Sequence, residues 1–82
     1  MVNQDKLYEF LYNGCVYESS PATISIHRTR EGAYKAMNEH REEKYKQFLE
    51  DMEKMRRLDL PTEHFEFGEY EEWDVHEILL QD

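Results

Sequence analysis

The chain has little of what makes a disulfide-stabilised or membrane-anchored protein. Its 82 residues include one cysteine, Cys15, so an internal disulfide is excluded. No apolar run has the length or the flanking charges of a signal peptide or a membrane span. We therefore expect a cytoplasmic protein with no membrane attachment, in a compartment that keeps thiols reduced.

The sequence also lacks the spaced residues that catalytic and metal sites need. No two of the four histidines and Cys15 are spaced to put two ligands on one face of one element. Nucleophile motifs, phosphate-binding glycine loops and dinucleotide fingerprints are missing. Carboxylates are abundant, but acid–base catalysis needs one with a shifted pKa in a cleft. We expect no metal, cofactor or catalytic residue, and rank an enzyme or metal-binding protein last.

Basic residues are missing from the last quarter of the chain. Residues 61–82 contain eight acids and no Lys or Arg, whereas residues 1–60 contain eleven acids and ten bases. The formal net charge of −9 therefore lies almost entirely in the C-terminal quarter. Such a surface repels nucleic acid and attracts basic surfaces. The alternative interpretation is that these acids only keep the protein in solution.

The longest pattern in the chain predicts one α-helix from Thr29 to about Leu58. The stretch is rich in Ala, Glu, Lys, Met and Leu, Thr29 is a suitable N-cap, and no helix breaker follows until Pro61. A helix of this length measures roughly 40 Å, about twice the roughly 20 Å of a typical strand. The first half can cover a sheet, and the second half needs another surface.

Apolar residues recur along the predicted helix in two groups. Small residues at its start suit close packing on a sheet. Residues 38–44 are almost entirely polar, and among them only His40 lies on the same helix face as the apolar residues. The second group forms a helix interface of Tyr45, Phe48, Leu49, Met52 and Met55. Its cover is either the chain folding back through Leu58, Leu60, Phe65 and Phe67, or a second protein. We favour folding back for Leu60 and Phe65, and expect that a homodimer could form in addition.

The remaining elements are predicted to be short strands near 6–12, 15–18, 22–27 and 72–80. Asn13-Gly14 is a strong signal for a tight hairpin turn between the first two strands. Clean alternation in 23–27 predicts that Ile24 and Ile26 face the core. In the last strand, Trp73 and Val75 share a face while Ile78 and Leu80 take the other. Either both faces are partly covered or a β-bulge near Glu77 resets the alternation.

These elements predict a single α+β domain over residues 1–82. A small antiparallel sheet of three to four strands carries one long helix packed across one face. Arg28 and Arg30 at the helix start could hold an anion, but pairing with Asp74 or Glu77 is favoured because acids are in excess there. Of the aromatic residues interleaved with the acids, we expect Trp73 and Phe67 in the core and Tyr70 exposed.

The residues around the two strand ends carry a resemblance. His27-x-Thr29-x-Glu31-x-Ala33 after an apolar strand, and Trp73-x-Val75-x-Glu77 near the end, resemble a strand–cap–helix–strand pattern of small uncharacterised phage and bacterial proteins. The resemblance implies a two-layer domain of one helix on an antiparallel sheet. It also implies a phage or mobile-element origin, where small acidic proteins often bind and block a host protein. It carries over no catalytic residue.

Non-covalent binding to a protein is the function that we expect first. A phage-encoded inhibitor or modulator would engage a host protein through the distal helix and an acidic C-terminal surface, the latter made of Glu66, Glu69, Tyr70, Glu71, Glu72 and Asp74. The alternative is a nucleic-acid mimic that occupies a DNA- or RNA-binding groove. We expect no direct binding of nucleic acid and no binding to a membrane.

Overall fold

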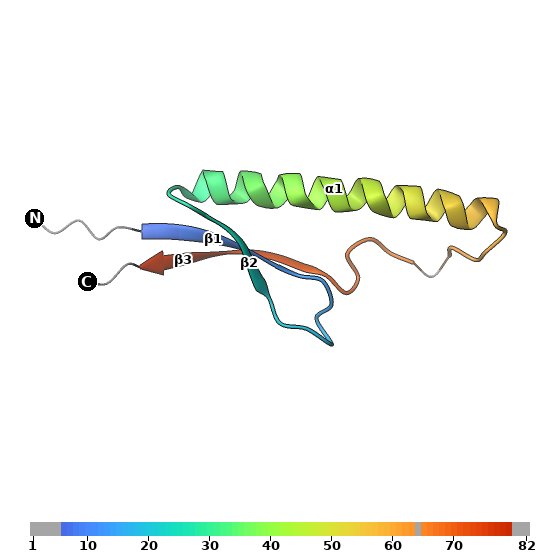
Figure 1. Ribbon diagram of the computed structural model, residues 1–82, viewed down its shortest axis with the longest axis horizontal. Coiled ribbons are helices and arrows are strands. Elements are labelled where there is room, and N and C mark those ends of the chain that lie inside the picture. The colour runs from blue at the N-terminus through green and yellow to red at the C-terminus, as the bar shows by residue number, and fades with distance from the viewer. Residues whose placement is uncertain (1–5, 64, 80–82) are drawn as a thin grey trace, which may run out of the picture.

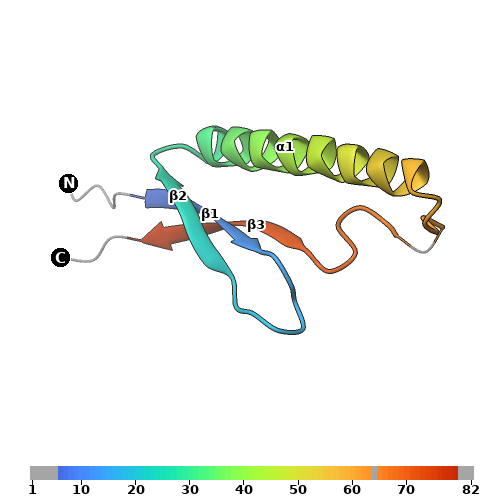
Figure 2. The same ribbon diagram turned by 45° about the vertical axis from the view of Figure 1, so that its right-hand side comes forward.

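Three strands and one helix make up the domain in the computed structural model, which describes residues 6–63 and 65–79 (Figure 1). In chain order they are β1 (Lys6–Asn13), β2 (Ala22–His27), α1 (Arg30–Arg57) and β3 (Glu72–Leu79). The sheet has the order β2-β1-β3, and both neighbours run antiparallel to β1. Helix α1 lies along one face of this sheet (Figure 2). The predicted α+β class is confirmed.

The core lies between the central strand β1 and the first half of α1. Phe10 on β1 is only 1% exposed, and Ala33 on α1 is fully buried. Phe10 stands opposite Ser25 on β2 and Val75 on β3. Side chains alternate along a strand, so Tyr8 and Tyr12 share the helix-facing side with Phe10.

The start of α1 approaches the sheet closely because its first turn carries small residues. The hydroxyl of Thr29 accepts a hydrogen bond from the Gly32 backbone N–H at 3.0 Å, which confirms the predicted N-cap. A Cβ at Gly32 would lie 3.0 Å from that hydroxyl and 3.5 Å from the His27 side chain. Gly32 and Ala33 together leave room for β2 beneath the helix.

The predicted strand at 15–18 and its tight hairpin are wrong. Residues 14–21 form an irregular loop, and β1 pairs directly with β2. Asn13 is 4% exposed, and its side chain donates to the Ser19 carbonyl and accepts from the Cys15 backbone N–H. Its amide therefore holds a wide loop together, in the manner of an Asx turn, instead of serving a two-residue turn.

The predicted orientation of β2 is also wrong. Ile24 and Ile26 are 48% and 55% exposed, whereas Ser25 and His27 are half-buried. The pairing with β1 shifts between Phe10 and Leu11, which leaves Ile24 as an extra residue. Alternation in a sequence shows which residues share a face but not which face is covered, and here α1 covers the polar one.

Strand β3 keeps one unbroken register with β1 from Glu72 to Leu79, so no bulge lies near Glu77. Both faces of β3 are instead partly covered. Trp73 and Val75 are half-buried on the helix side, and Ile78 is half-buried opposite Leu7 on the other side. The prediction for Leu80 lies outside the described residues.

Helix α1 ends in a tight backbone turn that reverses the chain. Asp59 has a φ of 56°, and the backbone N–H of Leu60 donates to the Met55 carbonyl at 2.9 Å. This is a Schellman cap with Asp in the position that usually holds glycine. The chain then runs back beside the distal half of α1 as the return segment, residues 58–63 and 65–71 (Figure 1).

Candidate functional site: an acid-lined groove

An open groove of about 540 Å³ lies between the distal half of α1 and the return segment. Phe48, Met52 and Met55 line it from α1, and Phe65 lines it from the return segment. Tyr12 on β1 and Gly14 just after it also line the groove. The groove exists because α1 outruns the sheet and the chain that covers the overhang has no regular structure.

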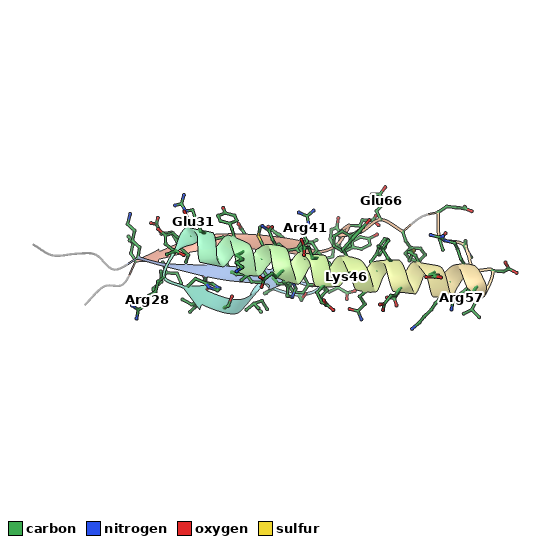
Figure 3. All side chains as sticks on the ribbon, turned by 90° about the horizontal axis from the view of Figure 1, so that it is seen from above. Arg28, Glu31, Arg41, Lys46, Arg57 and Glu66 are labelled. Carbon is green, nitrogen blue, oxygen red and sulfur yellow. The ribbon has the colours of Figure 1, made fainter. Side chains whose placement is uncertain are left out.

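The groove is strongly acidic. Its described lining includes four carboxylates, from Asp51, Glu66, Glu69 and Glu71, and one base, Lys44. The Lys44 ammonium lies 5.3 Å from the centre of the Tyr12 ring, where a cation–π interaction holds it. Figure 3 shows Glu66 standing out from the return segment on one side of α1. An apolar floor with a negative rim suits a ligand that carries both apolar and positive groups.

Phe67 anchors the return segment to the rest of the molecule. Its ring lies 5.0 Å from the ring of Tyr45, and 5.7 Å from the rings of both Phe48 and Trp73. Phe67 and Trp73, which the sequence predicts in the core, are both half-buried and lie beside the enclosed core of Phe10 and Ala33 rather than in it. Gly68 follows with a φ of 76°, a conformation that glycine adopts at little cost, and turns the chain over the Trp73 ring. Side-chain packing therefore fixes this wall of the groove.

Polar groups join the groove floor to the sheet. The Tyr12 hydroxyl donates a hydrogen bond to the Glu71 carboxylate. Burial, and next that bond and the charge of Glu71, raise the pKa of Tyr12 to about 12. The phenol therefore stays protonated and keeps donating at physiological pH.

His40 lies directly behind this floor. Its Nδ1 accepts a hydrogen bond of 3.0 Å from Trp73 Nε1, and its ring lies 4.5 Å from the Tyr12 ring and 5.3 Å from the Phe10 ring. Burial, followed by the charge of Lys44, lowers the pKa of His40, while Glu71 acts in the opposite direction. The imidazole is therefore held in its neutral form.

Tyr70 lies at the rim of the groove and is 50% exposed, as predicted. The neighbouring Glu69, through its charge and a hydrogen bond, raises the pKa of the Tyr70 phenol. The Tyr70 carbonyl accepts a 2.8 Å bond from the Val16 backbone N–H. This bond ties the loop after β1 to the return segment.

The groove brings together most of the two residue sets that the sequence singled out. Seven of the eleven line it: Phe48, Met52, Met55, Glu66, Glu69, Tyr70 and Glu71. The other four do not.

Tyr45 contacts the Phe67 ring away from the groove, and Leu49 is 48% exposed outside it. Glu72 and Asp74 are exposed on β3, where Asp74 bonds to His76 at 2.8 Å. The acidic quarter is therefore divided, with Glu66, Glu69 and Glu71 in the groove and Glu72 and Asp74 elsewhere.

Several contacts at the site were missed or misjudged from the sequence. Asp51, Lys44 and Tyr12 were not predicted to belong to the site. Lys44, Phe48, Asp51 and Met55 follow one another at three and four residues along one helix face. This spacing could have indicated that Lys44 and Asp51 belong to the site. No local sequence pattern predicts the hydrogen bond between His40 and Trp73, which lie 33 residues apart in the chain.

The predicted pairing of Arg28 and Arg30 with Asp74 or Glu77 is wrong. Arg30 lies over the Tyr8 ring, 5.5 Å from its centre. Glu77 pairs with Lys6 at 3.3 Å, and Asp74 pairs with His76. Tyr8 stands opposite Glu77 and offers its π face to the guanidinium of Arg30.

Within residues 6–63 and 65–79, no three His, Cys, Asp or Glu side chains gather as a metal site would require. No described helix combines the length and apolarity that a membrane crossing needs.

Compared with protein-family models, curated proteins and solved structures, the chain matches none of them.

Proposed function

We propose that this protein is a binding module that captures a basic, amphipathic segment of another protein in the acid-lined groove. The observation that carries the proposal is the composition of the groove: four carboxylates around a floor of Phe48, Met52, Met55 and Phe65. Met side chains adapt to irregular apolar partners, and carboxylates select positive ones.

The length of the groove supports a short helical partner. Lys44 and Met55 are the outermost α1 residues in its lining. Their separation of eleven residues corresponds to about 17 Å of helix, or roughly three turns. A partner helix of that length can place an apolar stripe on the floor and basic residues against the rim. Aliphatic or aromatic residues alternating with Lys or Arg every three to four positions would mark such a segment.

The division of the acids favours this function over nucleic-acid mimicry. A mimic needs carboxylates in one array that repeats the spacing of phosphates. Glu66, Glu69 and Glu71 line the groove, while Asp74 lies on the sheet face opposite α1. Mimicry remains the alternative that the experiment below must exclude.

The phage origin and the inhibitory role stay predictions based on the resemblance. The homodimer also stays a prediction, and the structure changes the surface to be tested for it. Phe48 packs against Phe67 of its own chain, whereas Leu49 is exposed on the helix. Leu49→Glu is therefore the cleaner variant to test by sedimentation. A dimer through the helix should dissociate.

Two charge-reversal variants matched in charge test the proposed function. One carries Glu66→Lys and Glu69→Lys in the groove, and the other carries Glu72→Lys and Asp74→Lys outside it. Both raise the net charge equally, so any general electrostatic effect is shared. Each tagged variant is used to capture proteins from a bacterial lysate, with quantification by mass spectrometry at low and high salt.

A groove ligand should bind the wild type and the β3 variant but lose at least about tenfold in recovery with the groove variant. Met52→Glu should lose the same protein, whereas Leu49→Glu should keep it. Equal loss with both charge variants, combined with a steep decrease as salt rises, would indicate a phosphate mimic and overturn the proposal.

A further inference from the structure

His40 lies where the helix, the sheet and the groove wall meet. Its ring contacts Tyr12 and Phe10 on β1, and its Nδ1 bonds to Trp73 at the start of β3. Trp73 in turn lies under Phe67 and Gly68 of the return segment. A change in the protonation of His40 can therefore affect the groove wall through Trp73, which contacts both His40 and Phe67.

The hydrogen bond between His40 and Trp73 has only one possible direction. Indole Nε1 carries a hydrogen and cannot accept, so His40 Nδ1 must offer a lone pair. The proton of the neutral imidazole then lies on Nε2. A second proton would occupy Nδ1, and two N–H groups would face each other at the present 3.0 Å separation. Protonation and this bond therefore exclude each other.

The charged groups around His40 add to this effect. From α1 itself, Lys44 lies over the Tyr12 ring and its charge disfavours an imidazolium at His40, while Arg41 lies 5.5 Å from the centre of the Trp73 ring. From β1, Tyr12 presents a neutral phenol. From the return segment, Glu71 is the facing acid, and it already accepts the Tyr12 hydroxyl. Lys44 would repel an imidazolium, and the charge of Glu71 would offset this only in part.

We propose that His40 is a proton-operated latch on the groove. Neutral His40 holds Trp73 and thereby keeps Phe67 and the return segment in place. Protonated His40 releases Trp73, and the wall of the groove loosens. The latch regulates the site described above, so its biological role rests on the proposed function, although its operation can be measured without any partner.

The lowered pKa of His40 sets the direction of the response. Because the folded state favours the neutral form, the latch is closed above the ordinary value of 6.5. It opens as the pH falls from there through the folded-state pKa. Stability decreases over the same interval. Acidification should therefore weaken the groove, and a return to neutral pH should restore it.

The test follows the Trp73 indole N–H by ¹H–¹⁵N NMR from about pH 7.5 to about pH 5. The chain has a single tryptophan, so one indole signal reports on the latch. We expect this signal to shift in one transition with a midpoint below 6.5. The backbone amides of Phe67, Gly68 and Glu69 should shift with the same midpoint.

Two variants make the test specific. In His40→Gln the side-chain carbonyl can still accept from the indole but does not titrate, so the transition should disappear and the signal should stay near its neutral-pH position. His76→Gln alters an exposed histidine that pairs with Asp74, and it should leave the transition unchanged.

The latch is contradicted if the transition persists in His40→Gln, or if Trp73 titrates while the amides of residues 67–69 do not. Neither result depends on a partner, so a failed latch leaves the proposed function standing. Conversely, a working latch combined with equal loss of capture in both charge variants would overturn the groove function alone.

Discussion

The two halves of α1 are covered in different ways. The first half rests on a hydrogen-bonded sheet, where Phe10 and Ala33 are completely enclosed. The second half faces a return segment that has no regular structure and is held by the Phe67 side chain and by the bonds of Tyr12 and His40. Leu58, Leu60 and Phe65 remain 48–70% exposed there. The contrast indicates that side chains are tightly enclosed at the sheet end and more loosely covered at the distal end.

The largest effect is expected at the sheet end. Phe10→Ala should lower the free energy of unfolding by about 3–5 kcal/mol, because it removes the most enclosed large side chain of the described core and leaves a cavity. A domain of this size has about 4–12 kcal/mol in total, so the variant should lose a large share of its free energy of unfolding and melt at a much lower temperature. Thermal denaturation followed by circular dichroism measures this.

Phe65→Ala is the matched control, since this phenylalanine is 53% exposed in the groove. It should cost less than about 1 kcal/mol. Equal losses from the two substitutions would contradict the division of the molecule into a tightly enclosed and a more loosely covered end.

A smaller and more local effect is expected at the anchor of the return segment. Phe67→Ala should cost about 2 kcal/mol, roughly half of a full core deletion because the ring is half-buried. It should change the fluorescence of Trp73, which Phe67 contacts, while the amides of β1 remain protected from exchange. Loss of protection throughout the sheet would show that the return segment supports the core as well.

The N-cap of α1 should contribute less. Thr29→Ala removes the acceptor of the Gly32 N–H and should cost about 1 kcal/mol, measured as a lower urea midpoint. Thr29→Ser preserves the hydroxyl and should lie close to the wild type. If Thr29→Ser is as destabilising as Thr29→Ala, the hydroxyl is not the source of the effect.

The smallest effect is a gain of stability at the reversal of the chain. Asp59 adopts a left-handed conformation, so Asp59→Gly should relieve strain and stabilise the protein by about 0.5–1 kcal/mol. Asp59→Ala should be destabilising, because alanine is strained there and lacks the local hydrogen bonding of Asp. A loss of stability with glycine would mean that the Asp59 carboxylate has a role of its own.

Local patterns in the sequence predicted the helix, its Thr29 cap and all three strands of the described sheet to within two residues, together with a fourth strand that is a loop. They failed where a tertiary contact decides the outcome. Asn13 is buried and holds a loop, and α1 covers the face of β2 that carries Ser25 and His27, so Ile24 and Ile26 are exposed. Many residues of the two groove walls were singled out from the sequence, but the meeting of the walls depends on the turns at Asp59 and Gly68, which no periodicity encodes.

Amide hydrogen exchange along α1 in the wild-type protein tests the contrast between the two ends most directly. The account predicts that protection is greatest from about Ala33 to His40, over the sheet, and decreases toward Met52 and Met55, beside the groove. Adding a captured partner should raise protection in the distal half alone. Uniform protection along the helix, unchanged when the partner binds, would contradict the account.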